Sequence, residues 1–273
     1  MKVAFLKTIK CASTSVQNIL LRYALKHNLN IVLPEKEMKK QGGFNVKYTI
    51  NDWSEDQAQP RFGKHLIENT PWEIANLTYH MFLLHTRWDH REISQVMNPQ
   101  GKENVFYFTI LRDPVMLFRS YWDFFGLAQI YGKTLDEYVK TTISQYVLYN
   151  NMTWTHPGYN QMLNDFGMNF HDMMKGQIEH KDNMGSNKQV AKMLHEIDRS
   201  FNLVLLADEE YFEDGMVLLK HDLCWEYEDI INVKRNTRSK THRSILSENS
   251  RKIIKGNIHH ATLTDKISRR KVL

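Results

Sequence analysis

A short apolar strand, a polar loop without glycine and an amphipathic helix open this chain, and this unit most constrains its fold. Val3–Leu6 forms the apolar run and Lys7–Ser13 the polar stretch. Apolar side chains then recur with helical spacing at Val16, Ile19, Leu20, Tyr23 and Ala24. Ser13 or Thr14 is predicted to cap this helix, so that its positive dipole end meets the loop amides beyond the strand.

The same order of strand and helix recurs twice along the chain. Val105–Leu111 is predicted as a buried strand, with Asp113 as N-cap and Pro114 at the first position of the next helix. Leu203–Leu206 is predicted as a third strand that leads into another helix. Strands separated by long helical stretches indicate an α/β fold, a P-loop-like parallel sheet with helices on both faces.

Length and composition favour a single domain over residues 1–273. The chain has 42% hydrophobic and 25% charged residues, which excludes disorder and collagen-like repeats. No run approaches 18 apolar residues, so we expect no segment that spans a bilayer. The net charge of +5 favours anionic ligands but is too small for a typical nucleic-acid binder. The basic tail after about residue 240 is predicted to be solvated or frayed.

The two cysteines, Cys11 and Cys224, give neither a zinc site nor a disulfide framework. A single bridge and two free thiols both remain open. Two Asn-x-Thr sequons, at Asn76 and Asn151, would accept glycans in a secretory compartment.

The loop after the first strand has the chemistry of a phosphate cradle. It offers the ammonium groups of Lys7 and Lys10, several hydroxyl groups and a helix N-terminus. The pattern G-x-x-x-x-G-K-[ST] is absent, so it is not a Walker loop. A capped helix whose lysines face water is the alternative for this loop taken alone.

A second cationic element follows the next strand. Arg112 stands where open α/β sheets bind ligands, and Ser120 follows two helical turns later. A guanidinium group there could hold a second phosphate, whereas an Arg112–Asp113 pair that stabilises the turn is the alternative. Together the two elements indicate a ligand with phosphates at two ends.

Several ordered blocks of this sequence resemble the galactose-3-O-sulfotransferase family, which includes galactosylceramide sulfotransferase. The resemblance extends from about Val3 to about Asn236, and it implies the fold of sulfotransferases that use 3′-phosphoadenosine 5′-phosphosulfate (PAPS) as co-substrate. The blocks that carry it are Phe5–Thr8, Gln17–Leu20, Leu111–Pro114, Phe124–Gly126, Leu203–Leu206, Val217–Lys220 and Leu223–Glu226.

The resemblance implies roles for individual residues. Lys10 would lie against the phosphosulfate bridge, and His85, in a block similar to the family's His-Met-Arg-Phe, would be the catalytic histidine. The rest of the 5′-phosphosulfate loop would be Lys7, Thr8, Ser13, Thr14 and Ser15. The 3′-phosphate would be held by Arg112 and Ser120, and a later segment near the nucleotide would supply Asn236 and Arg238.

The implied reaction moves a sulfuryl group from PAPS to the 3-OH of a galactose on a galactosylceramide-like glycolipid or on a glycan. His85 would take the hydroxyl proton while Lys10 neutralises the leaving phosphate, and no metal would be needed. The partner would be a galactose-terminated acceptor and not a nucleic acid. The family resemblance implies a type II Golgi membrane glycoprotein, whereas this sequence shows no anchor, so we expect either a cytosolic protein or a chain that begins downstream of a leader.

Two positions depart from the family pattern. Ile9 and Cys11 stand where the family usually has a histidine and a threonine, which would remove a polar contact to donor or acceptor. The chain also ends without the family's aromatic-rich terminal segment. The alternative is therefore a non-catalytic relative that binds nucleotide or glycan, and a nucleotide kinase is a weaker third choice because the Walker loop is absent.

Overall fold

A parallel sheet of four strands, in the order β2-β1-β3-β4, forms the centre of the computed structural model. β1 (Lys2–Leu6), β3 (Val105–Leu111) and β4 (Leu203–Leu206) confirm the three predicted strands, and β2 (Met81–Phe82) is a short strand that the sequence analysis missed. Every strand pair is parallel. The predicted α/β fold class is therefore confirmed.

The structure describes residues 1–32, 78–143, 162, 165–167, 195, 197–208, 210–231 and 243–257. The longer helices are α1 (Ser13–Lys26), α3 (His90–Met97), α4 (Pro114–Phe124), α10 (Phe212–Leu223) and α12 (Glu248–Asn257). The shorter ones are α5 (Leu127–Tyr131), α6 (Leu135–Tyr138), the π-helix η4 (Val139–Ile143) and α11 (Tyr227–Ile230).

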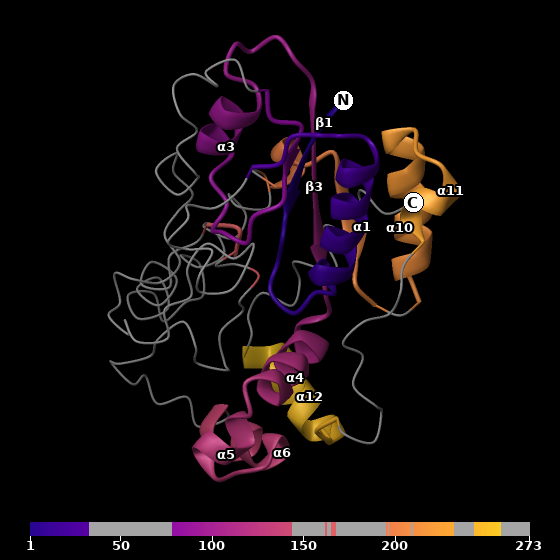
Figure 1. Cartoon of the computed structure of the whole chain (residues 1–273). Helices are drawn as coiled ribbons and strands as arrows, with labels where there is room; N and C mark the ends of the chain where they lie inside the picture. Colours follow the sequence, from indigo (N-terminus) through magenta and orange to yellow (C-terminus); the bar gives the residue numbers. More distant parts are fainter. Residues whose placement is uncertain are drawn as a thin grey trace.

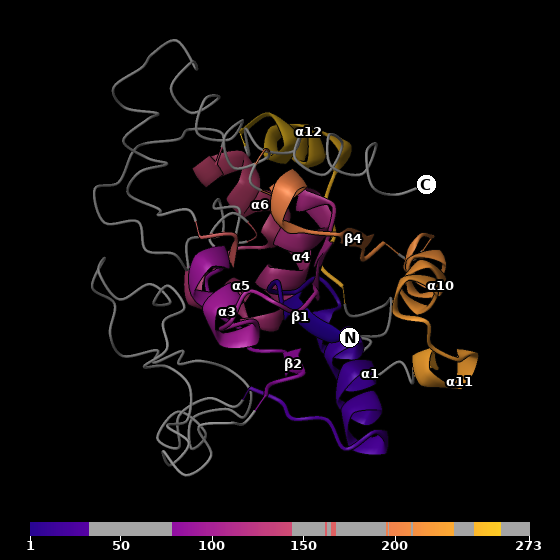
Figure 2. The ribbon, with the colours of Figure 1, turned by 90° about the horizontal axis from the view of Figure 1, so that it is seen from above.

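Helices lie on both sides of the sheet. Figures 1 and 2 show α1 and α10 on one side and α3 on the other. β1 is accordingly buried along its whole length, and the rings of Phe5 and Phe108 stack across β1 and β3 with centroids 4.7 Å apart. Coverage of both faces explains why the strands are nearly continuous apolar runs.

The start of α4 follows the prediction from its sequence. The Asp113 carboxylate accepts a hydrogen bond of 3.0 Å from the Met116 amide, and Pro114 occupies the first helical turn. Both features are local to the chain, since the cap partner is three residues away.

The C-terminal segment is not frayed, which makes that prediction wrong for the residues that the structure describes. Helix α12 packs against α4, and Leu246 and Ile254 are buried in a second hydrophobic cluster that includes Val115 and Phe118. Because α12 is rich in basic residues, the sequence analysis did not recognise the apolar positions of this segment as core positions. Periodic burial of one face, rather than net charge, decides where a helix docks.

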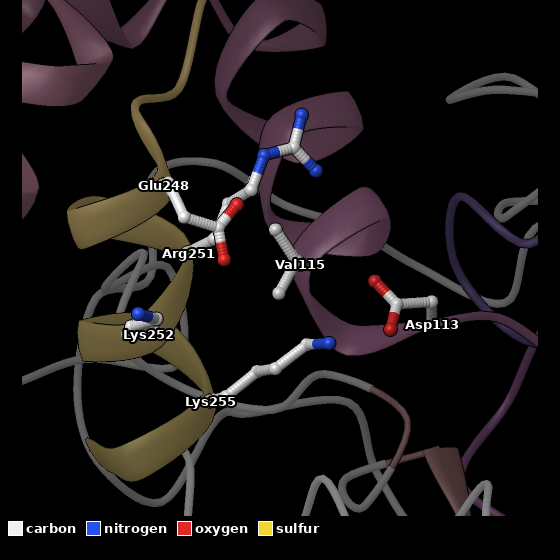
Figure 3. A pocket seen from close by; sticks show the side chains of 6 residues that line it. All are labelled: Asp113, Val115, Glu248, Arg251, Lys252 and Lys255. Atoms are coloured by element: carbon white, nitrogen blue, oxygen red, sulfur yellow. The ribbon is translucent and has the colours of Figure 1, made fainter.

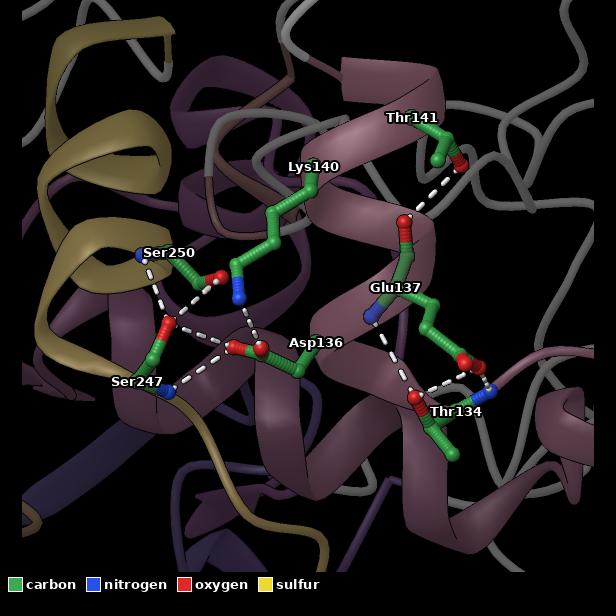
Figure 4. Close-up of polar contacts among 7 residues, drawn as sticks. All are labelled: Thr134, Asp136, Glu137, Lys140, Thr141, Ser247 and Ser250. Carbon is green, nitrogen blue, oxygen red and sulfur yellow. Dashed lines mark hydrogen bonds and ion pairs between the residues drawn. The ribbon is translucent and has the colours of Figure 1, made fainter.

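Polar contacts fix the beginning of α12 (Figure 4). The amide and hydroxyl of Ser247 both donate to the Asp136 carboxylate over 2.8 Å, and Lys140 forms an ion pair of 2.6 Å with the same carboxylate. These hydrogen bonds hold the pKa of Asp136 well below its usual range, although burial acts in the opposite direction. The segment before α12 is thus tied to α6 and η4.

Both cysteines are free thiols, with Cys11 buried and Cys224 exposed. The bridge between them, left open by the sequence, does not form. None of the helices in the described part of the chain is long and apolar enough to cross a membrane.

Replacement of Ile254 by alanine tests the docking of α12. Ile254 is fully buried in the second cluster, so Ile254→Ala should lower the free energy of unfolding by about 2–5 kcal/mol, as measured by urea denaturation. Ile245→Ala is the matched control, because Ile245 is 84% exposed and should change stability by less than about 0.5 kcal/mol. Equal small effects from both variants would mean that α12 is not docked.

Candidate functional site

Three strand ends bring basic groups to one edge of the sheet. Lys7 follows β1 directly, Arg112 follows β3 directly, and His85 stands three residues after β2. Because β2, β1 and β3 are adjacent and parallel, these positions lie side by side at their carboxyl ends. Open α/β sheets bind ligands at this edge.

The β1–α1 loop, residues 7–12, has an unusual backbone. Lys10 and Ala12 both have φ of 55°, in the left-handed region that most side chains avoid. Ala12 occupies the N-cap position with no side-chain cap, so the predicted cap by Ser13 or Thr14 is wrong. Ser13 belongs to the helix, and its hydroxyl donates to the Thr8 carbonyl over 2.5 Å.

Three hydrogen bonds from distant segments hold this loop. The Thr8 hydroxyl donates to the Ile110 carbonyl over 2.5 Å, and the Arg112 guanidinium donates to the Lys10 carbonyl over 2.9 Å. The Ile9 amide donates to the Asp165 carboxylate over 2.7 Å. The two cationic elements predicted from the sequence are therefore in direct contact.

The hydroxyl groups of the loop divide into two pairs. Those of Thr8 and Ser13 are buried and donate to carbonyl oxygens, whereas Thr14 is exposed and Ser15 half-buried at the first turn of α1. No acidic residue stands in that turn. An anion at this helix end would therefore meet Thr14, Ser15 and the backbone amides.

Lys10 lies beside an exposed aromatic ring. Its ammonium nitrogen is 3.6 Å from the centroid of the Phe124 ring, which is 56% exposed. A cation over a ring face is attracted by the ring quadrupole. This contact holds the side chain at the edge of the sheet where Arg112 also stands.

The second cationic element also has the predicted position. Arg112 and Ser120 are both half-buried, at the end of β3 and on α4. The alternative, an Arg112–Asp113 pair, is not what the described residues form: Asp113 caps α4, and Arg112 contacts the β1–α1 loop. The positive charge of Arg112 also acts on Asp208, whose pKa is nevertheless raised because burial dominates.

Burial changes the ionisation of Lys7. Desolvation lowers the pKa of its ammonium group to about 8. Near neutral pH the group is mainly charged, but its proton is more easily lost than that of an ordinary lysine. An anion bound beside Lys7 would stabilise the charged form.

His85 is buried rather than open to solvent, with a side chain only 4% exposed. Burial, and to a smaller degree the charge of Lys7, lowers the pKa of its imidazole to about 3, so the ring is neutral at pH 7. Its Nε2 lies 3.8 Å from Oδ1 of Asp165, and burial raises the pKa of that carboxyl well above its usual range. The same Asp165 accepts the amide of Ile9, so His85 and the β1–α1 loop share one partner.

Sequence reasoning did not find Asp165. It stands 156 residues from Ile9 along the chain, and no local pattern marks it. Asn236 and Arg238, which were assigned to the nucleotide, lie outside the described residues. Within the part of the chain that is described, no group of three or more metal-ligating side chains occurs.

Known proteins resemble this chain over most of its length. The sequence profile described as galactose-3-O-sulfotransferase matches residues 1–265. Galactose-3-O-sulfotransferase 2 of Mus musculus is 31% identical over 257 residues, which cover 91% of this chain and 56% of that protein. Galactose-3-O-sulfotransferase 3 of Mus musculus is 29% identical over 252 residues, or 89% of this chain and 49% of that protein.

A relative with a different name is similar to nearly the same extent. Galactosylceramide sulfotransferase of Bos taurus is 27% identical over 238 residues, which cover 86% of this chain and 48% of that protein. The chain thus spans about half the length of the curated relatives it matches. Because the family profile covers nearly all of its residues, the chain belongs to the galactose-3-O-sulfotransferase family.

Proposed function

We propose that this chain transfers a sulfuryl group from PAPS to the 3-OH of a galactose on a glycolipid or glycan. The observation that supports this most is the hydrogen bond between Arg112 and the Lys10 carbonyl. It joins two cationic elements at neighbouring strand ends, as a ligand with phosphates at two ends requires. Family membership implies the same donor.

In the proposed reaction the acceptor oxygen attacks the donor sulfur, and the bond from sulfur to the bridging phosphate oxygen breaks. Lys10 stabilises the negative charge that grows on that oxygen. The hydroxyl proton passes to the imidazole of His85, which is neutral at pH 7. Because burial lowers the pKa of this ring to about 3, the transfer requires that the negative charge of the bound donor raise that pKa. The Asp165 carboxyl lies 3.8 Å from this ring and in its ionised form would stabilise the imidazolium ion, although burial raises the pKa of the carboxyl.

The two residues that depart from the family pattern, Ile9 and Cys11, both have buried side chains. Cys11 is fully buried, its thiol donates to the Ile9 carbonyl over 3.2 Å, and burial raises the pKa of this thiol to about 12. The Ile9 side chain packs in the second hydrophobic cluster with Val115 and Phe118. Both side chains therefore contribute to the packing of the β1–α1 loop.

The acceptor and the compartment are parts of the same proposal. A galactose-terminated acceptor follows from the family, and galactosylceramide is one candidate among glycolipids and glycans. We place the activity in the Golgi lumen, the compartment in which the sequons at Asn76 and Asn151, both outside the described residues, would act as glycan acceptors.

Sulfate transfer from labelled PAPS tests the proposal directly. Galactosylceramide, lactosylceramide and N-acetyllactosamine serve as acceptors, and we expect label on at least one. Lys10→Ala should abolish transfer and weaken donor binding by about 1.5–3 kcal/mol, the contribution of a charged hydrogen bond. Lys102→Ala, at an exposed position, removes the same charge and should leave transfer unchanged. Binding of the nucleotide without transfer to any acceptor would support the non-catalytic alternative.

The lowered pKa of Lys7 predicts that donor affinity depends on pH. Its pKa of about 8 means that it loses its charge as the pH rises through 8, whereas phosphate groups are fully ionised above about pH 7. The affinity for adenosine 3′,5′-bisphosphate should therefore fall between pH 7 and 9.5, with proton uptake on binding, as measured by calorimetry in buffers of different ionisation enthalpy. Lys7→Arg should remove the proton uptake and flatten the decline. A wild-type affinity independent of pH over this range would remove Lys7 from the donor site.

His85 and His80 form a matched pair for the catalytic base. His80 is half-buried, and its Nδ1 accepts the Asn30 amide over 3.1 Å, which is a structural role. Because His85 is buried, glutamine is a better replacement than alanine, which would leave a cavity. His85→Gln should lower turnover by about 10²–10⁴ with unchanged donor affinity, and His80→Gln should retain turnover.

Two outcomes would contradict this assignment. Normal turnover in His85→Gln, at the wild-type melting temperature, would mean that another group is the base. A joint loss of donor affinity, stability and turnover would mean that His85 acts through Asp165 on the β1–α1 loop.

A further inference from the structure

One buried carboxylate contacts both halves of the candidate site. Oδ2 of Asp165 accepts the Ile9 amide over 2.7 Å, and Oδ1 of the same carboxylate lies 3.8 Å from Nε2 of His85. Ile9 belongs to the β1–α1 loop, whereas His85 follows β2. A single side chain is therefore shared by the loop that we propose to bind the donor and by the histidine that we propose as the base.

Backbone contacts fix the position of Asp165 relative to the segment that carries His85. The Trp88 amide donates to the Asp165 carbonyl over 2.7 Å, and the Arg87 guanidinium donates to the Gly167 carbonyl over 2.9 Å. Gly167 has φ of 93°, and a Cβ atom at this position would lie 2.6 Å from the Trp88 carbonyl oxygen. The close approach of the two segments therefore requires glycine here.

The carboxylate of Asp165 also restrains the backbone of the β1–α1 loop. Its contact with the Ile9 amide is buried, and Asp165 is 1% exposed. The next residue, Lys10, has φ of 55°, and its carbonyl accepts the Arg112 guanidinium. Hydrogen bonds thus hold the loop on both sides of this left-handed residue. Because a buried amide without an acceptor is costly, loss of the carboxylate would favour another loop backbone.

We propose that Asp165 positions the donor loop and the base relative to each other. Through the Ile9 amide it sets the backbone that carries Lys10, and its second carboxylate oxygen faces His85. Asp165 is thus a positioning residue, because it acts through these groups. The inference rests on the proposed function and adds Asp165 to the residues that determine donor affinity. A misplacement of about 1 Å between reacting groups can lower a rate about 100-fold.

Two replacements of similar size test the inference. Asp165→Asn keeps an acceptor oxygen for the Ile9 amide, whereas Asp165→Leu removes it. By calorimetry, Asp165→Leu should weaken adenosine 3′,5′-bisphosphate roughly 10-fold, and Asp165→Asn should remain within about twofold of the wild type. Asp165→Asn should nevertheless lower turnover with labelled PAPS roughly 10- to 100-fold, because a neutral amide replaces the carboxylate that faces His85. A merely structural role would make affinity follow the melting temperature instead.

Asp229→Leu is the matched control for the loss of a buried carboxylate. Asp229 is 8% exposed, accepts the Glu226 amide over 3.0 Å and forms an ion pair of 2.8 Å with Lys26. Lys26 lies in the last turn of α1, at the opposite end of this helix from the β1–α1 loop. Asp229→Leu should therefore lower the melting temperature and leave the affinity for the bisphosphate unchanged.

Gly167→Ala moves Asp165 without altering its carboxylate. The added Cβ atom would clash with the Trp88 carbonyl oxygen, so residues 165–167 must shift. We expect the affinity for the bisphosphate and the turnover to fall together. Gly132→Ala imposes the same left-handed strain, with φ of 61°, but its Cβ atom would meet no atom within 4 Å. This control should change neither quantity.

A pocket between α4 and α12 is a second place where charge alone could hold the nucleotide (Figure 3). Figure 3 shows Lys255 extending from α12 toward Asp113. The described residues that line this pocket are three cations, two carboxylates and one valine: Arg251, Lys252, Lys255, Asp113, Glu248 and Val115. Asp165 is not among them, so a nucleotide held only there would bind all Asp165 variants equally.

The outcomes separate this inference from the proposed function. Wild-type protein that fails to bind the bisphosphate would overturn the proposed function itself. Wild-type binding with equal affinities in Asp165→Leu and Asp165→Asn, or with normal turnover in Asp165→Asn, would overturn the positioning role alone. If Asp165→Leu does not fold, Gly167→Ala decides, and affinity and turnover equal to those of Gly132→Ala would overturn the inference.

Discussion

β1 and β3 run parallel and in register, with Leu6 opposite Thr109, so the chain leaves both strands at the same edge of the sheet. The Thr109 hydroxyl donates to the Leu6 carbonyl over 3.1 Å, and the Thr8 hydroxyl donates back to the Ile110 carbonyl. The first of these buried bonds joins the last paired residues of the two strands, and the second continues the contact beyond them. The positions of Lys10 and Arg112 follow from this pairing, and a change in register would separate them.

Buried ionisable groups surround this edge of the sheet. Asp165 accepts the Ile9 amide and faces His85, while burial and, to a smaller degree, the charge of Lys7 lower the pKa of the same imidazole. Such clusters are costly in a low-dielectric interior unless their members satisfy one another, and they are typical of functional sites. A ligand that brings several negative charges would therefore change the ionisation of groups that it does not touch.

Local patterns predicted the parts of this fold whose contacts are local. The three strands and the Asp113–Pro114 start of α4 could be predicted because apolar runs and helix caps depend on neighbours in sequence. The Ser13 cap failed because the Thr8 carbonyl, five residues back, is its actual partner. Asp165 and the docking of α12 were missed because their partners are more than 100 residues away.

The left-handed backbone of Lys10 and Ala12 replaces the glycines that usually shape phosphate-binding loops. Each such residue costs about 1–2 kcal/mol, which the hydrogen bonds from β3 and Asp165 offset. Side chains at these positions also reduce the number of conformations available to the unfolded loop. Folding, rather than ligand binding, therefore supplies the free energy that orders this loop. A substitution that relaxes the loop backbone would raise the stability of the folded protein and lower its affinity for the ligand together.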